Sequence, residues 1–391
     1  MENTIKTIEP MLTIANRLND VKEYYFSIKL REVRDLIKQG KPIINLGIGS
    51  PDLNPPKEVI SALVNADIHG YQSYQGIPEL RKSISEFYKK YYGVSLDFEN
   101  EILPLMGSKE GILHISMAFL NNGDQVLIPD PGYPTYASVT KLIQAVPVSY
   151  ALKESNHWWP DLDAIEKMDL SKVKIMWVNY PHMPTGSNAS DELFEKLIAF
   201  GKKHSILIVN DNPYSFILNE NPKSILSIKG AKDVAIELNS LSKTFNMAGW
   251  RVGMVVGKSD YLESILKVKS NMDSGMFFGI QQGAIKAMSL TKSWFDQNNK
   301  VYEKRRTLIW QICDRINCTY DNNSTGLFVW AKIPGDKTSE AMTDELLYNY
   351  DTFITPGTVF GNQGEGYIRF SLCTEEEKII EVINRLSKYE S

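Results

Sequence analysis

A single lysine stands among hydroxyl side chains in residues 239–251, which read NSLSKTFNMAGWR and are expected to form a loop after a strand. Ser240 and Ser242 precede or adjoin Lys243, and Arg251 follows eight residues later. A buried lysine has a lowered pKa, so its amine becomes a nucleophile that can bond to an aldehyde cofactor. Two hydroxyls and a guanidinium are the donors that a phosphate group requires. Alone, such a segment is more often a surface turn, so the rest of the chain must decide.

The remaining polar candidates follow short apolar stretches that are predicted to be strands. These stretches are 125–129, 174–179, 206–210, 234–238 and 253–257, separated by helical patterns such as residues 191–203. The alternation predicts an α/β fold whose mainly parallel sheet is covered by helices. The polar side chains just past the strand ends are Tyr133, Asn179, Asp211, Tyr214 and the group from Ser240 to Lys243. Because ligands bind outside the carboxyl ends of such strands, one shared site is expected.

A second anion-binding element is predicted at residues 106–111, MGSKEG, before an apolar helix that runs to about residue 120. Ser108 is placed to act as the N-cap of this helix. The free N–H groups at a helix start bind anions. A plain capped helix without a ligand is the alternative interpretation.

Gly47 and Gly49 indicate close backbone approach to another group. No helix-opening glycine follows them, and Pro51 interrupts the segment. A dinucleotide-binding fingerprint is therefore rejected.

The composition is that of an ordinary soluble globular protein. The chain has 391 residues and a net charge of −4 without a long basic run, which argues against nucleic acid or an anionic membrane as partner. No apolar run approaches the roughly 18 residues of a membrane span, and the N-terminus lacks a signal-peptide pattern. Cys313, Cys318 and Cys373 have no metal-ligand spacing, so reduced thiols in the cytoplasm and no metal are expected.

Three parts of the chain are expected. Residues 46–285 carry the strand–helix alternation and form a large domain. Residues 286–391 change to one long helical pattern, strands near 326–332 and 366–372, and a closing helix, which predicts a smaller α+β domain. Residues 1–45 are expected to join that smaller domain.

Together, these motifs resemble the class I (class I/II) aminotransferases of the fold-type I pyridoxal phosphate superfamily, in the family's order, from Asn45 to Leu372. The resemblance implies a seven-stranded large domain and a shared active site in a homodimer. It makes Lys243 the Schiff-base lysine and proton shuttle, pairs Asp211 with the pyridine nitrogen, and brings Tyr214 to the ring hydroxyl. The resemblance also brings Asn179 to the cofactor and stacks Tyr133 on its ring. The residues that it places around the cofactor phosphate are Ser108, Lys109 through its backbone N–H, Ser240, Ser242, Arg251 and Tyr71 of the neighbouring subunit.

The substrate end of the implied site contains one departure from the family. Arg369 would bind the substrate α-carboxylate, and Gly49 and Met183 would also lie at the substrate. Met183 stands where the family has an asparagine in its Asn-Pro-Thr-Gly turn. A thioether donates no hydrogen bond and accepts only weakly. Another group must then cover the cofactor's ring oxygen: Tyr214 alone, Asn179, His182 or a water.

The implied function is ping-pong transfer of an amino group from an L-amino acid to a 2-oxo acid, 2-oxoglutarate being the expected acceptor. A lyase that performs elimination on the same scaffold is the first alternative, and a cofactor-binding regulator is the second. No side-chain cation can be assigned to a second substrate carboxylate, so aspartate, alanine, aromatic, methionine and diaminopimelate donors stay open. Residues 107–111 and the turn that contains His182 are most similar to the branch of the family that holds aspartate-, alanine- and diaminopimelate-type enzymes.

Overall fold

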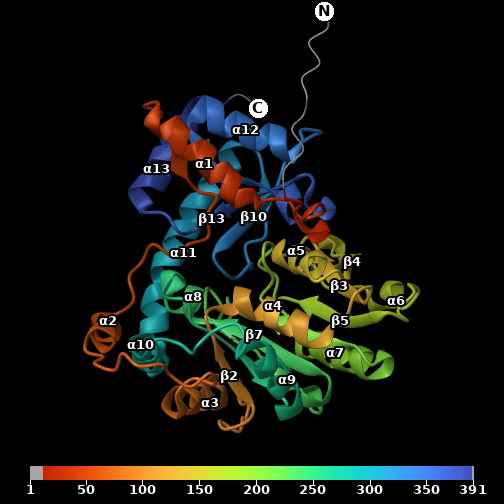
Figure 1. Cartoon of the computed structure of the whole chain (residues 1–391). Helices are drawn as coiled ribbons and strands as arrows, with labels where there is room; N and C mark the ends of the chain where they lie inside the picture. The colour runs from red at the N-terminus through yellow and green to blue at the C-terminus, as the bar shows by residue number, and fades with distance from the viewer. Residues whose placement is uncertain (1–11, 390–391) are drawn as a thin grey trace, which may run out of the picture.

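A seven-stranded sheet forms the centre of the larger part of the molecule (Figure 1). A computed structural model describes residues 12–389. The strands, in spatial order, are β2 (Ile102–Leu105), β8 (Gly253–Gly257), β7 (Ala235–Ser240), β6 (Leu207–Asp211), β5 (Val173–Val178), β3 (Gln125–Asp130) and β4 (Val146–Ala151). Only β8 runs antiparallel to its neighbours, and the other strands share one direction. The predicted mainly parallel sheet is confirmed.

Helices cover both faces of this sheet, which explains why its strands read as continuous apolar runs. One face packs against α4 (Ser108–Phe119), α5 (Thr135–Leu142) and α9 (Ser259–Lys269). The other face packs against α3 (Pro78–Tyr92), α7 (Asp191–His204) and α10 (Phe278–Met288). Alternation along β5 divides the two cores, because Trp177 faces the first and Met176 faces the second.

The sequence patterns did not predict the two edge strands, β2 and β4. Each contains a proline, Pro104 in β2 and Pro147 in β4. Proline cannot donate a ladder hydrogen bond and is tolerated at sheet edges. The edge position therefore explains why these segments form strands although their composition argues against it.

A second, smaller assembly lies above the large sheet in Figure 1, around α11 (Lys292–Arg315), α12 (Ser339–Tyr350) and α13 (Glu376–Arg385). Its sheet has the order β12 (Thr355–Pro356), β13 (Tyr367–Ser371), β10 (Phe328–Lys332) and β9 (Thr319–Tyr320). Helix α1 (Tyr25–Lys38) packs against this assembly, and β1 (Ile44–Asn45) pairs with β11 (Thr352–Phe353), whereas residues 1–11 of the predicted N-terminal segment lie outside the described residues. The domain boundaries near residues 45 and 285 stay predictions.

Two local predictions are wrong. Ser108 is the first residue of α4 rather than its N-cap, and Gly107, which has no side chain, occupies the cap position. Lys243 does not lie in a loop after the strand, because β7 continues directly into the single-turn helix α8 (Leu241–Thr244).

Helix α2 (Lys57–Val64) packs on α10, away from the sheet. Among the described residues, no helix combines the length and apolar character that a membrane crossing requires.

Candidate active site

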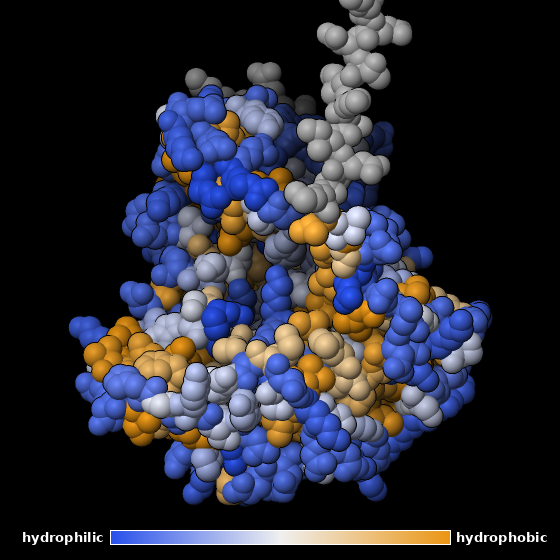
Figure 2. Space-filling view, viewed as in Figure 1, coloured by the Kyte–Doolittle hydropathy of each residue, from blue (hydrophilic) through white to orange (hydrophobic). Residues whose placement is uncertain are grey.

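A cavity of about 510 Å³ lies between the carboxyl ends of β5, β6 and β7 and the smaller assembly. Its wall includes the start of α1 on one side and the start of α4 on the other, and it opens in the hollow between these parts in Figure 2. All the residues predicted for the site line this cavity except Tyr71. They are Gly49, Ser108, Lys109, Tyr133, Asn179, Met183, Asp211, Tyr214, Ser240, Ser242, Lys243, Arg251 and Arg369.

Lys243 points its amine into this cavity. The Nζ atom donates a hydrogen bond to the Gly49 carbonyl, and burial lowers the pKa of the amine, with Arg369 and Arg251 acting in the same direction. A side chain at position 49 would collide with Phe328, because a Cβ there would lie 2.2 Å from the ring. Glycine is therefore required for the approach of this loop to Lys243. An amine with a lowered pKa can act both as nucleophile and as base.

One corner of the cavity has the donors that a phosphate requires. The Arg251 guanidinium lies against Gly107, where a Cβ would come within 2.0 Å of Nη2. Helix α4 begins beside it and presents the free N–H groups of its first turn. Ser240 and Ser242 are buried at the end of β7 and the start of α8, and Ser242 Oγ lies 3.5 Å from Arg251 Nη1. Cation, hydroxyls and helix terminus thus converge on one anion-sized space.

Asp211 ends β6 with an incompletely satisfied carboxyl group. The Oδ2 atom accepts a hydrogen bond of 2.8 Å from the Tyr136 hydroxyl, while Oδ1 has no partner among the described residues although it is buried. Burial raises the pKa of this carboxyl to about 7, and the Tyr136 hydrogen bond opposes the rise. A buried acceptor without a partner is costly, and the protonated ring nitrogen of pyridoxal phosphate would supply one. The residues present therefore fit this cofactor.

Arg369 lies at the opposite end of the cavity among aromatic rings. Its guanidinium carbon lies 4.0 Å from the ring centre of Phe328 and 4.6 Å from that of Phe360. Nη2 donates to the Gly47 carbonyl at 2.7 Å, and burial lowers the pKa of Arg369 to about 10. No carboxylate of the described chain pairs with this buried cation within 4.0 Å. A substrate carboxylate would provide that missing charge.

Met183 contacts Arg369 directly, with Sδ 3.4 Å from Nη1. The backbone N–H of Met183 donates to Asn179 Oδ1 at 2.8 Å, and the Asn179 amide nitrogen donates to the Asp211 carbonyl. Asn179 therefore ties the ends of β5 and β6 together. His182 lies behind the wall, hydrogen-bonded to Thr185 Oγ1 at 2.8 Å, so it does not line the cavity. Tyr214 also lines the cavity, and its hydroxyl has no assigned hydrogen-bond partner among the described residues. Of the side chains considered for the ring oxygen, we therefore favour Tyr214.

The charge balance of the cavity favours anions. Among the described residues that line it, the cations are Lys109, Lys243, Arg251 and Arg369, and Asp211 is the single carboxylate. Lys109 Nζ lies 4.4 Å from the ring centre of Tyr24, and no carboxylate of the described residues forms an ion pair with it. Burial and Arg251 lower the pKa of Lys109. Apart from Lys243 and the two arginines placed for a phosphate and an α-carboxylate, Lys109 thus remains as a further cation.

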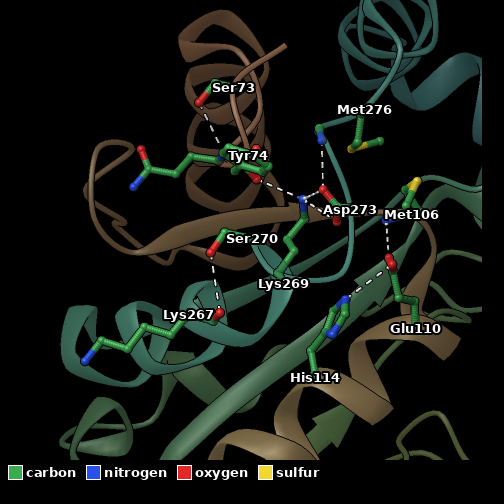
Figure 3. Close-up of polar contacts among 12 residues, drawn as sticks. Ser73, Tyr74, Met106, Glu110, His114, Lys267, Lys269, Ser270, Asp273 and Met276 are labelled. Carbon is green, nitrogen blue, oxygen red and sulfur yellow. Dashed lines mark hydrogen bonds and ion pairs between the residues drawn. The ribbon is translucent and has the colours of Figure 1, made fainter. Parts of the chain in front are cut away.

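A network of charged residues supports the first turn of α4 from behind (Figure 3). Glu110 accepts from the Met106 N–H and lies 3.2 Å from His114 Nε2, while Lys269 pairs with Asp273 at 2.9 Å. Glu110, His114 and Asp273 are close enough to share a metal ion. The Lys269 ammonium already balances Asp273, and it also donates to the Tyr74 carbonyl. We therefore interpret this cluster as a structural ion network that joins α4 to the loop after Tyr71.

Tyr71 is the predicted site residue that the structure does not bring to the cavity. Its side chain is 91% exposed. Other exposed apolar side chains lie on the adjoining segments, namely Val64 of α2 and Met272 and Phe277 before α10. Figure 2 shows apolar surface where Figure 1 places α2.

Four of the side chains that line the cavity were not predicted from the sequence to do so. Tyr136, in the first turn of α5, reaches Asp211, and the Lys109 side chain enters the cavity although only its backbone N–H was expected there. Tyr24 and Phe26 enter from the start of α1. The aromatic cluster at 24–26 was the one available signal for this wall.

Comparisons with known proteins agree on one family. The sequence profile of the family "Aminotransferase class I and II" matches residues 41–386. The LL-diaminopimelate aminotransferase of Aquifex aeolicus is 39% identical over 96% of this chain and 99% of its own length. The apo structure of BacF from Bacillus subtilis superposes with a TM-score of 0.92 at 33% identity, covering 97% of this chain and 98% of that one. An aminotransferase from Staphylococcus aureus gives a TM-score of 0.87 at 31% identity, covering 95% and 98%.

Proposed function

The chain belongs to the aminotransferase class I and II family and is a pyridoxal phosphate-dependent aminotransferase, and we propose that its amino donor carries a second carboxylate, as LL-diaminopimelate does. The Lys109 ammonium, unpaired within the described chain, is the observation that supports this choice. Arg369 would bind the α-carboxylate, and Lys109 would bind the distal one. The acceptor 2-oxoglutarate has the same two charges, so one pair of cations would serve both half-reactions.

We assign the following roles to the residues around the cofactor. When bound, pyridoxal phosphate supplies an electron-accepting ring. Lys243 would hold it covalently, Asp211 would pair with its ring nitrogen, and the Arg251 corner would hold its phosphate. The freed Lys243 amine would take the proton from the substrate Cα, and its lowered pKa favours the unprotonated form that this role requires. In the full cycle, the donor's amino group and the acceptor's keto oxygen exchange places.

The Arg369 contacts restrict the orientation of the substrate. Its guanidinium is fixed between Phe328 and Phe360, so a bidentate carboxylate would be held in one plane. Fixing the carboxylate would restrict the orientation of the Cα bonds relative to the bound cofactor. Arg369 would in this way favour loss of the proton over loss of carbon dioxide. The lyase that the sequence left open is not favoured, because the similar proteins are named aminotransferases.

The distal-carboxylate assignment predicts a specific change in donor preference. LL-diaminopimelate and L-lysine form a matched pair, since lysine lacks only the distal carboxylate. We expect Lys109→Gln to lower kcat/KM for LL-diaminopimelate about 10- to 100-fold, the range for losing a hydrogen bond to a charged group. Activity with L-lysine should change little. Lys258→Gln, at an exposed lysine outside the cavity, serves as the control. Equal wild-type kcat/KM for the two donors would refute the assignment.

We also propose a homodimer in which Tyr71 reaches the phosphate corner of the partner subunit. The exposure of Tyr71 beside Val64, Met272 and Phe277 supports an apolar contact surface there. Mixing inactive Tyr71→Phe and Lys243→Ala subunits should restore roughly a quarter of wild-type activity, since random pairing makes half of the dimers mixed and each has one intact site. Absence of activity above the sum of the separate variants would contradict a shared site.

A cytoplasmic location is proposed from the three buried, unpaired cysteines.

A further inference from the structure

The Tyr136 hydroxyl is the one side-chain hydrogen-bond donor to the Asp211 carboxyl group within the described chain. Both residues are almost fully buried, at 1% and 5% exposure. The bond uses Oδ2 and leaves Oδ1 as the free acceptor. A carboxylate with one oxygen held by a hydrogen bond and the other oxygen free presents a single acceptor in a fixed direction.

The Tyr136 ring is itself held in place. It stacks on Trp177 of β5 with ring centres 4.8 Å apart and an angle of 9° between the planes. Its hydroxyl thereby passes over the end of β5 and reaches the end of β6, where Asp211 lies. Tyr133, which lies just before α5, packs edge-on against the same ring, with ring centres 5.6 Å apart. Tyr136 therefore has little freedom to withdraw its hydroxyl from the carboxylate.

Two effects disfavour the ionised form of Asp211. Burial raises the pKa of this carboxyl, and buried Glu237, on the adjacent strand β7, acts in the same direction through charge repulsion. The Tyr136 hydrogen bond is the contribution that favours the ionised carboxylate. A hydrogen bond to the charged form stabilises that form.

We propose that Tyr136 is a positioning residue that fixes the Asp211 carboxylate for the ring nitrogen of pyridoxal phosphate. The inference rests on the proposed role of Asp211 as the partner of that nitrogen. Tyr136 would act through Asp211 and would make no bond to the cofactor.

Tyr150 provides a matched control. It is also buried, at 4% exposure, and its hydroxyl donates a hydrogen bond of 2.7 Å to the Trp177 backbone carbonyl. Tyr150→Phe therefore removes one buried phenol oxygen beside the same tryptophan without touching Asp211. Any general cost of losing such a hydroxyl will appear in both variants.

The test is direct titration of the apoproteins with pyridoxal phosphate, and with the carbocyclic analogue in which CH replaces the ring nitrogen. We expect Tyr136→Phe to raise the Kd for pyridoxal phosphate about 10-fold or more, since a hydrogen bond to a charged group is lost. Tyr150→Phe should bind as the wild type does. The analogue should bind equally to the wild type and to Tyr136→Phe, because it has no nitrogen for Asp211 to meet.

Two results would overturn the proposal while leaving the cofactor assignment intact. The first is a Tyr136→Phe affinity equal to that of Tyr150→Phe, and the second is an equal loss with the analogue. A double-mutant cycle adds a third check, since Tyr136→Phe should cause no further loss in an Asp211→Asn background. If the wild type itself binds no pyridoxal phosphate, the proposed function fails, and this inference fails with it.

Discussion

Lys243→Ala is expected to abolish transamination. The variant lacks the amine that would hold the cofactor and move the proton at the substrate Cα, and loss of a positioned acid–base group alone costs about 10²–10⁴-fold in rate. The fold should persist, because Lys243 makes its one assigned hydrogen bond to a loop carbonyl. Single-turnover kinetics measures the effect at the chemical step.

Lys258→Ala serves as the control for this variant, since Lys258 is exposed and forms a surface ion pair with Asp260. Added small amines should restore part of the lost rate in Lys243→Ala if the missing group is a base. Near-normal turnover in Lys243→Ala would remove this residue from the mechanism.

Asp211→Asn should have the second-largest effect on activity. Asparagine keeps the shape of the side chain but removes the negative charge next to the ring nitrogen. The expected loss in kcat is about 10²–10³-fold, as for removing one preorganised electrostatic partner. Pyridoxal phosphate affinity should fall as well, whereas the carbocyclic analogue should bind equally to both proteins. Asp233→Asn, at an exposed carboxylate paired with Lys202, is the control.

The same variant should change the pH dependence of apoprotein stability. Burial raises the pKa of the Asp211 carboxyl to about 7 from its ordinary 3.8. Between these values the native state binds a proton that the unfolded chain has lost, so stability falls as pH rises from about 4 to about 7. The wild-type apoprotein should lose more stability over this interval than Asp211→Asn. Denaturant unfolding of both apoproteins at pH 4, 5, 6 and 7 measures the difference, and parallel curves would contradict it.

Much of the candidate site could be predicted because the apolar runs in the sequence indicate where the strands end. Asp211 and Ser240 end apolar runs, and parallel strands bring their carboxyl ends to one edge. Lys243 and Arg251 follow within the next few residues, so their proximity needs no long-range information. The same reasoning located Tyr133 and Asn179.

What could not be predicted depends on side-chain direction and on distant segments. Tyr136 reaches across β5 to β6, which requires knowledge of the strand order and of its stacking on Trp177. The Lys109 side chain meets Tyr24, a contact between segments about 85 positions apart in the chain. The N-cap assigned to Ser108 was wrong because Gly107 has a positive φ of 90°, a backbone conformation that places the cap one residue earlier.

The account depends on a covalent bond between pyridoxal phosphate and one particular lysine. Incubating the purified protein with the cofactor, reducing it with borohydride and mapping its peptides by mass spectrometry tests this bond directly. The predicted result is a stable pyridoxyl group on the peptide that contains Lys243, absent from the Lys243→Ala variant. A pyridoxyl group on a different lysine, or on none, would contradict the assignment of this cavity as the active site.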